Sequence, residues 1–210
     1  MYSFLIGAAR VADNLAPAIF GGCALVPVDG GWIGRCPFHA GTRQPTLFVS
    51  GRYPLWRCFA GHEGGDWTAY LARRHGLNLP ESILAIAQRT KSAAPVFLPN
   101  ESDWRRADRR GTLLWAVEHL SQGRLWTKRG REAVTSLTAR GVREEKIVAD
   151  GVGIVTTPDE TRAYLREKGL FDPALFADCG LDAAVDYAVR VADRDPIGRV
   201  TGFREYGPPA

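Results

Sequence analysis

The chain has 210 residues, of which 45% are hydrophobic and 24% are charged. This balance is typical of one ordinary domain or two small ones, and it excludes both a wholly disordered chain and a bundle of membrane helices. The net charge of +4 is spread unevenly, at +3 over residues 1–75, +4 over residues 76–150 and −3 over residues 151–210. The basic excess in the first two-thirds permits binding to phosphates, although it does not identify a partner.

The longest apolar stretch, residues 15–28, contains two prolines and two glycines and is too short to cross a bilayer. The first residues carry no basic segment ahead of an apolar run, so we expect no signal peptide. These features predict a cytoplasmic protein with no membrane partner. In such a chain the four cysteines are expected to be thiols or metal ligands and not disulfides.

Short strands and turns are predicted from about residue 24 to residue 60. The first hairpin spans residues 26–33 and places its tight turn at Asp29–Gly30–Gly31. A second hairpin joins a strand over 46–50 to a strand over 55–58. Side chains of both strands alternate in type, as a half-exposed sheet requires.

Helices are predicted to take over after residue 65. Asp66 is a suitable N-cap for a helix over 67–74 that stops at Gly76, and another helix follows Pro80 over 81–90. Two prolines and the lack of a hydrophobic period predict a linker over 91–101. Beyond the linker we expect helices over 103–120 and 131–140, a helix capped at Thr157, a short helix from Asp172, and strands over 186–192 and 199–204 around a turn at Asp195–Gly198.

Two pairs of potential metal ligands flank the second hairpin. Cys36 and His39 form a C-x2-H pair, and Cys58 and His62 form a C-x3-H pair. Two such pairs, each on a turn beside a strand, build a tetrahedral site of thiolates and imidazoles, for which Zn²⁺ is the best fit. A closed set of four ligands leaves no open coordination position, so we expect one structural zinc ion. The alternative is a chance grouping of core cysteines and surface histidines, which the tight pairing disfavours.

Residues 34–66, GRCPFHAGTRQPTLFVSGRYPLWRCFAGHEGGD, resemble the zinc-binding domain of DnaG-type DNA primases of bacteria, phages and plasmids. That family has a C-P-x-H pair, an x-P-S-F-x-V strand, and a hairpin strand that ends in C-F-x-C-x-x-G-G-D. The family's fourth ligand is usually a cysteine three residues after the third, which is the place of Gly61 here. We expect His62 to take this role; otherwise Cys23 or water completes the site.

A weaker resemblance extends over about residues 10–206. Residues 133–149 are similar to the family's Y-L-x-x-R-G-L helix and the helix after it, and residues 194–203 are similar to its I-R-D-x-x-G-R-V-x-G-F hairpin, early in the RNA polymerase core. In the family the catalytic Toprim region follows, and phosphoryl transfer of this kind needs clustered carboxylates that hold Mg²⁺. The chain ends at Ala210, where that region would begin. The resemblance therefore implies no catalytic residue here, and Mg²⁺ only with a Toprim region elsewhere.

Together these patterns predict an α+β fold in which a small antiparallel zinc-ribbon sheet precedes a mostly helical segment that ends in a β-hairpin. The expected domains are a zinc-ribbon DNA-binding domain with C-terminal helices over 1–90, the linker over 91–101, and the N-terminal subdomain of a primase-type RNA polymerase core over 102–210. Asp193 and Asp195 form a D-x-D pattern, which the hairpin context indicates to be a turn and not a metal site.

The resemblance implies that the ribbon sheet meets single-stranded DNA template. Aromatic side chains that stack on bases and cations that pair with phosphates lie along the second hairpin, and two arginines of the later hairpin align with basic residues of the family. The expected nucleic-acid contacts are Arg52, Tyr53, Trp56, Arg57, Arg194 and Arg199. The basic clusters at 105–110 and 124–131 are either solvated helix faces or a phosphate track.

We therefore expect the N-terminal part of a DNA primase, which binds template and supports RNA primer synthesis together with a Toprim-containing region and a replicative helicase. Two alternatives stay open at this point. One is a stand-alone, non-catalytic, zinc-dependent protein that binds single-stranded DNA and derives from a primase. The other is a zinc-ribbon module that binds protein. Steep weakening by salt is expected of DNA binding and separates the last alternative from the others.

Overall fold

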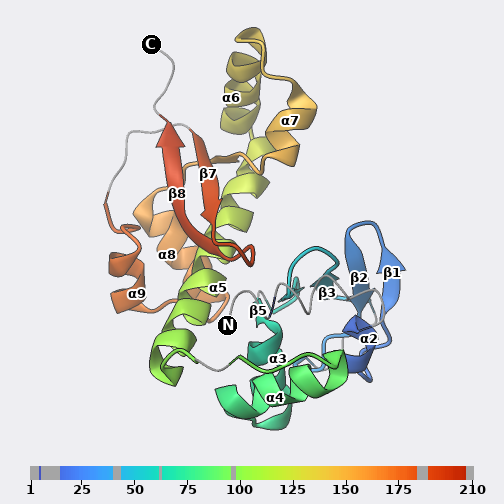
Figure 1. The fold of residues 1–210 in the computed structure, drawn as a ribbon. Helices are drawn as coiled ribbons and strands as arrows, with labels where there is room; N and C mark the ends of the chain where they lie inside the picture. The colour runs from blue at the N-terminus through green and yellow to red at the C-terminus, as the bar shows by residue number, and fades with distance from the viewer. Residues whose placement is uncertain are drawn as a thin grey trace. The chain divides into compact units, whose positions relative to one another are not determined.

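The computed structural model of the chain describes residues 5, 15–39, 44–61, 63–95, 98–183 and 189–206 (Figure 1). Its contacts divide the chain into two compact units. Unit 1 contains Met1–Thr112 and Asp195–Arg199, and unit 2 contains Leu113–Arg194 and Val200–Ala210. The predicted linker ended at residue 101, whereas the first three turns of the following helix belong to unit 1, because their side chains contact the sheet of that unit.

Unit 1 is built on a five-stranded antiparallel sheet in which the strands follow one another in chain order. Both predicted hairpins are present, and Gly30 makes the first turn in a left-handed conformation with φ of +77°. The fifth strand was not expected from the sequence. The strands are β1 (Val26–Val28), β2 (Gly31–Gly34), β3 (Leu47–Ser50), β4 (Leu55–Cys58) and β5 (Glu63–Asp66).

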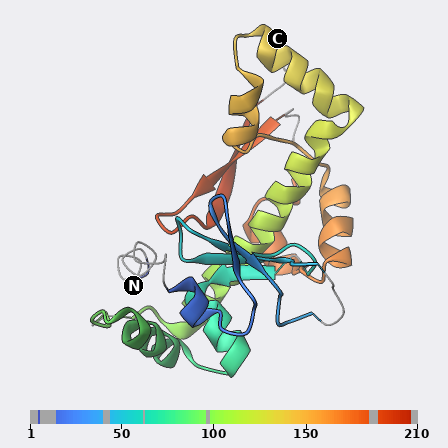
Figure 2. The same ribbon diagram turned by 90° about the vertical axis from the view of Figure 1, so that its right-hand side faces the viewer.

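Three helices accompany this sheet: α2 (Ala16–Ile19), α3 (Trp67–His75) and α4 (Leu79–Thr90). Asp66 caps α3 as predicted, since its carboxylate accepts a hydrogen bond from the backbone N–H of Ala69 at 2.9 Å. Asn78 and Glu81 form a reciprocal capping box at the start of α4, two residues before the predicted beginning of that helix. Helix α2 and the β1–β2 hairpin, both drawn in blue in Figure 2, belong to unit 1.

One hydrophobic core joins the sheet of unit 1 to α3. Trp56, Trp67 and Tyr70 are its largest fully buried side chains, and their rings pack with those of Phe20 and Phe38. Burial of so many aromatic rings supplies the main stabilising term for this small unit. Two cysteines of the predicted metal site belong to the same core.

Unit 2 surrounds the second half of helix α5 (Glu101–Gly123) and contains a three-stranded antiparallel sheet. Leu113, Leu114 and Val117 of α5 form one core with Leu165 of α8, and Figure 2 shows these two helices side by side. A second core lies around Leu125 and Ile147. The further elements are η2 (Arg124–Trp126), α6 (Lys128–Ala139), α7 (Glu144–Ala149), β6 (Gly153–Ile154), α8 (Pro158–Glu167), α9 (Pro173–Asp178), β7 (Val189–Arg194) and β8 (Val200–Tyr206).

The structure confirms the predicted fold class, because an antiparallel sheet is followed by helices and by the β7–β8 hairpin. Thr157 and Asp172 cap α8 and α9 as the sequence predicted. None of the described helices is both long and apolar enough to cross a membrane.

Candidate metal centre and nucleic-acid interface

Two cysteines and one histidine meet at one end of the ribbon sheet. Cys36 and His39 belong to the turn after β2, and Cys58 is the last residue of β4. The ligand atoms of the three side chains all lie within 4.8 Å of one another. Nδ1 of His39 is 3.2 Å from Sγ of Cys36 and 3.4 Å from Sγ of Cys58, so this ring nitrogen faces both sulfur atoms.

The two thiols differ in their protonation. The neighbouring Cys36 side chain lowers the pKa of Cys58 to about 4, against the effect of burial, and the N–H of Gly61 also favours the thiolate. The Cys58 sulfur in turn raises the pKa of Cys36, and burial adds to this rise. One thiolate therefore forms readily, whereas a second negative charge in the same place needs a cation beside it.

This donor set suits zinc. Two sulfur ligands and one imidazole nitrogen converge from two turns, which is the arrangement that structural zinc sites use. Sγ of Cys36, Sγ of Cys58 and Nδ1 of His39 would hold the ion, which would supply folding energy and neutralise the thiolates. The fourth predicted ligand, His62, lies outside the described residues.

Gly61 occupies the position at which the family that this sequence resembles usually has its fourth ligand. In this chain the space beside Gly61 is already filled. A Cβ atom at residue 61 would lie 1.8 Å from Nε2 of His39. The His39 ring thus takes the volume of any side chain at this position. Cys23, the other candidate for completing the site, is buried in the same core but is not in the cluster of ligand atoms, and its sulfur lies 3.2 Å from the Tyr70 hydroxyl oxygen.

Arg52 and Tyr53 form the turn between β3 and β4. The Ser50 hydroxyl accepts hydrogen bonds from both backbone N–H groups, and the Arg52 guanidinium carbon lies 5.1 Å from the centre of the Tyr53 ring. Arg52 is exposed and Tyr53 is half-buried, because its ring packs on Gly198. A shallow depression of about 440 Å³ lies next to Arg52, and its lining includes Trp32, a residue that the sequence pattern did not single out.

Trp56 and Arg57, two further residues of the predicted nucleic-acid interface, are buried in unit 1. Trp56 is 1% exposed and packs against the rings of Phe38 and Tyr70. The Arg57 side chain lies over Gly64 of β5 and donates a hydrogen bond from Nη1 to the Trp56 carbonyl oxygen at 3.0 Å. In this arrangement neither side chain offers a surface on which a base or a phosphate can rest.

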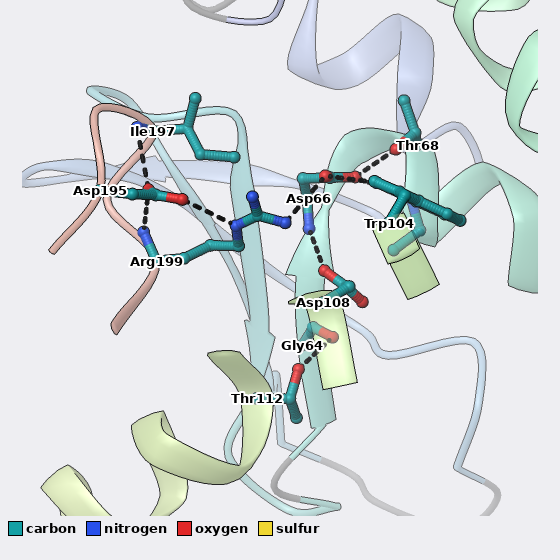
Figure 3. Close-up of polar contacts among 10 residues, drawn as sticks. Gly64, Asp66, Thr68, Trp104, Asp108, Thr112, Asp195, Ile197 and Arg199 are labelled. Carbon is teal, nitrogen blue, oxygen red and sulfur yellow. Dashed lines mark hydrogen bonds and ion pairs between the residues drawn. The ribbon is translucent and has the colours of Figure 1, made fainter. Parts of the chain in front are cut away.

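Arg199 is also buried, at 3% exposure, within a network of polar side chains in unit 1 (Figure 3). Its Nε donates to Asp195 Oδ2 at 3.0 Å, and its Nη1 lies 4.0 Å from Asp66 Oδ2. Asp66 further accepts hydrogen bonds from Thr68 and from the indole N–H of Trp104. The guanidinium therefore faces two carboxylates of its own chain.

Arg194, by contrast, lies in unit 2 with a partly exposed side chain. Its Nη2 pairs with Oε1 of Glu118 at 2.6 Å. Of the six predicted nucleic-acid contacts, the structure thus leaves Arg52, Tyr53 and Arg194 with accessible surface. Asp193, of the D-x-D pattern, pairs with Arg204 across the β7–β8 hairpin, whereas Asp195 holds the backbone of the turn.

Residues 18–100 match the family model of the CHC2 zinc finger. This segment contains the whole five-stranded sheet, the three clustered ligands and the helices α3 and α4. The part of the chain that builds the metal centre is therefore similar to the CHC2 zinc finger.

The chain is similar to bacterial DNA primases. It is 24% identical over 214 residues to the DNA primase of Listeria innocua, covering 93% of this chain and 33% of that protein, and 26% identical over 191 residues to the DNA primase of Geobacillus stearothermophilus, covering 82% and 31%. The chain thus spans about a third of the length of the curated relatives it matches. Among solved structures, that of the zinc-binding and RNA polymerase domains of the Aquifex aeolicus primase matches 98% of this chain and 51% of that chain, with 19% identity and a TM-score of 0.48.

Proposed function

We propose that this chain is the N-terminal, zinc-ribbon part of a DNA primase and that it binds single-stranded DNA template. The observation that carries the proposal is the cluster of Cys36, His39 and Cys58 at the end of an antiparallel sheet, inside the segment that matches the CHC2 zinc finger. The similarity to DNA primases along nearly the whole chain supports the same function.

The surface proposed to meet the template is the β3–β4 turn with the depression beside it. Arg52 supplies an exposed cation, Tyr53 an aromatic ring, and Trp32 part of the lining of the depression. Cations that pair with phosphates and rings on which bases stack are the two elements of single-strand binding. Trp56, Arg57 and Arg199 then act by holding the fold and not by touching DNA.

Primer synthesis needs carboxylates that hold Mg²⁺ against a nucleoside triphosphate. In the family that the sequence resembles, the Toprim region supplies them. We infer that the present chain contributes template binding and that a Toprim-containing region, with a replicative helicase, completes the reaction. On this proposal, the chain alone with Mg²⁺ incorporates no ribonucleotide on a single-stranded template.

The test is a fluorescence-anisotropy titration of the zinc-loaded full chain with a labelled single-stranded oligonucleotide at several salt concentrations. Binding should weaken steeply as salt rises, because each phosphate contact to a single strand contributes about −0.7 to the slope of log affinity against log salt. The double variant Arg52→Ala/Tyr53→Ala should bind at least about fivefold more weakly. Arg89→Ala, which removes an exposed arginine of α4 in the same unit, is the matched control.

Three outcomes would contradict the proposal. Absence of salt-sensitive binding by the zinc-loaded chain would favour a ribbon that binds protein. Ribonucleotide incorporation by the chain alone, abolished by changing Asp193 and Asp195 to Asn, would show an active site in the β7–β8 hairpin. If the chain binds template and also functions in its organism without a Toprim-containing region, the stand-alone DNA-binding protein would be favoured.

A further inference from the structure

An exposed tryptophan distinguishes the turn between α5 and α6 in unit 2. All six tryptophans of the chain lie in described residues, and five of them are buried or half-buried. Trp126, the last residue of η2, is 67% exposed. A single exposed apolar side chain is ordinary, but an indole ring is the largest apolar side chain and the best stacking surface among the amino acids.

The backbone that carries Trp126 is firmly held. Leu125 is buried in a core with Ile147, and the Trp126 carbonyl oxygen accepts a hydrogen bond from Nη1 of Arg131 at 3.0 Å. Gly130 packs so closely under the turn that a Cβ there would lie 2.2 Å from the Arg124 carbonyl oxygen. The ring is therefore presented to solvent by an ordered turn and not by a loose loop.

Thr127 fixes the exit from this turn, since its hydroxyl donates to the Arg124 carbonyl oxygen at 2.7 Å and accepts from the Gly130 N–H at 3.3 Å. The geometry at Trp126 is thus set before any ligand arrives. An indole on an ordered backbone loses less conformational entropy on stacking than an indole on a loose loop.

The residues beside the ring are cationic. Lys128 and Arg129, in the first turn of α6, are both exposed, and within the part of the chain that the structure describes neither makes an ion pair. Arg124 pairs with Glu160 of α8, and Arg131 donates to the Trp126 carbonyl oxygen. Lys128 and Arg129 are thus the two cations near Trp126 in sequence that are exposed and outside these contacts. Residues 124–131 contain no acidic side chain.

We propose that Trp126, with Lys128 and Arg129, is a stacking site for single-stranded DNA in unit 2, separate from the ribbon. The proposal rests on the proposed template binding and adds a contact to it. An apolar partner protein would need only the indole ring. A nucleic-acid strand uses the ring and the cations, because its base stacks on the indole and its phosphates pair with Lys128 and Arg129. The charge of the turn therefore favours the nucleic-acid strand.

The first measurement is the quenching of intrinsic tryptophan fluorescence in the full chain by a thymidine homopolymer. Because Trp126 is the most exposed of the six indoles, much of the quenching should be lost in Trp126→Phe, and the quenching that remains should come from Trp32 in the depression beside Arg52. In parallel, anisotropy titrations should show Trp126→Ala binding about 5- to 10-fold more weakly, with Trp126→Phe close to the unmodified chain and Trp126→Leu close to Trp126→Ala. Val148→Ala, which truncates another exposed apolar residue of unit 2, is the control and should change nothing.

The cations are tested by Lys128→Gln/Arg129→Gln. This double variant should lower the salt slope by about 1.4, which corresponds to two phosphate contacts. Equal binding by Trp126→Ala and the unmodified chain overturns the stacking site, and so does retention of binding by both the Phe and the Leu variants, because an apolar contact alone would then suffice. Loss of binding in Trp126→Ala but not in Arg52→Ala/Tyr53→Ala would uphold this site and reject the ribbon surface.

Discussion

Gly61 is the residue at which this ribbon departs from the pattern it resembles, and its surroundings give a physical reason for the departure. The His39 ring lies where a side chain at residue 61 would begin. Gly61→Ala should therefore push the ring away from the two sulfur atoms, weaken zinc binding and lower the free energy of unfolding by about 1–3 kcal/mol. Zinc content after dialysis against a chelator and a urea unfolding curve measure the two effects.

Gly21→Ala is the control for this substitution, since its Cβ would meet nothing closer than 3.9 Å and the residue does not need a positive φ. That variant should keep its zinc and its stability. If Gly61→Ala retained zinc as firmly as Gly21→Ala does, the position of the His39 ring described above would be wrong.

The zinc content of cysteine variants should distinguish the cysteines that bind the metal from those that do not. Cys58→Ser removes a sulfur from the cluster and should reduce the zinc content of the purified chain to well below one ion per chain. Cys23→Ser changes a buried thiol whose contact is the Tyr70 hydroxyl, and it should leave the zinc content unchanged. Zinc loss in Cys23→Ser would instead make Cys23 a ligand, and metal analysis by atomic absorption distinguishes the two results.

At the scale of elements, the polar network around Asp66 connects segments that are distant in sequence. Asp66 ends β5 and begins α3, Trp104 and Asp108 belong to α5, and Arg199 belongs to the turn after β7 (Figure 3). Buried carboxylates and a guanidinium are stable together only while each keeps its partners. The network thus specifies how the turn and the start of α5 join the ribbon sheet within unit 1.

Asp108 makes this network sensitive to pH. Burial and the nearby Asp66 carboxylate raise the pKa of Asp108 to about 7, against the opposing effect of Arg199 and Arg57. An acid whose pKa is raised in the folded state holds its proton there while the unfolded chain has lost it. Its contribution to stability is therefore greatest at low pH, declines between about pH 4 and pH 7, and is constant above.

Asp108→Asn removes this titration and keeps an oxygen that can accept the hydrogen bond from the Asp66 N–H. The gain in unfolding free energy over the unmodified chain should grow from about pH 4 to pH 7 and reach the order of 2 kcal/mol. Urea unfolding at several pH values gives the difference. Asp103→Asn, which changes an exposed aspartate of α5, is the control and should show no such pH-dependent gain in unfolding free energy. A difference that shrinks as pH rises would mean that the Asp108 carboxylate is stabilised by its arginines.

Local signals predicted most elements of the fold, because turns and caps depend on a few adjacent residues. Asp29–Gly30, Asp66 and Thr157 act where the sequence placed them. Strand β5 was missed, since its sequence EGGD contains residues that are rare in strands. Its glycines are explained only by tertiary packing: a Cβ at Gly64 would meet the Arg57 side chain at 2.5 Å, and one at Gly65 would meet Ala69.

The metal cluster of the candidate site was also predictable from local signals, as the turns and caps were. Ligand spacing along two turns placed Cys36, His39 and Cys58 together, because each pair is local and the hairpin joins them. The burial of Trp56 and Arg57, which lie on opposite faces of β4, was not predictable, since packing buries every residue of this strand: Trp56 lies in the core with Tyr70 of α3, and Arg57 lies over Gly64 of β5. An alternating pattern indicates a half-exposed strand only when one face stays open to solvent.

At the scale of the whole molecule, the residues of the hydrophobic cores indicate that the two units respond differently to the loss of zinc. Cys36 and Cys58 are themselves members of the unit 1 core, whereas the two cores of unit 2 contain no residue of the cluster. Structural zinc contributes on the order of 10 kcal/mol to folding in small domains. Removal of the ion should thus loosen unit 1 and leave the cores of unit 2 folded.

Hydrogen–deuterium exchange with and without a zinc chelator measures this difference directly. Amide protection should fall across β2 to α3 and stay unchanged in the second half of α5 and in α8, where Leu114 and Leu165 are fully buried. Cys58→Ser without chelator should reproduce the same pattern, and Cys23→Ser should not. Uniform loss of protection in both units would show that the chain folds as one cooperative body. Unchanged protection in β2 to α3 would show that the ribbon does not depend on its metal, and the structural role assigned to the cluster would then be wrong.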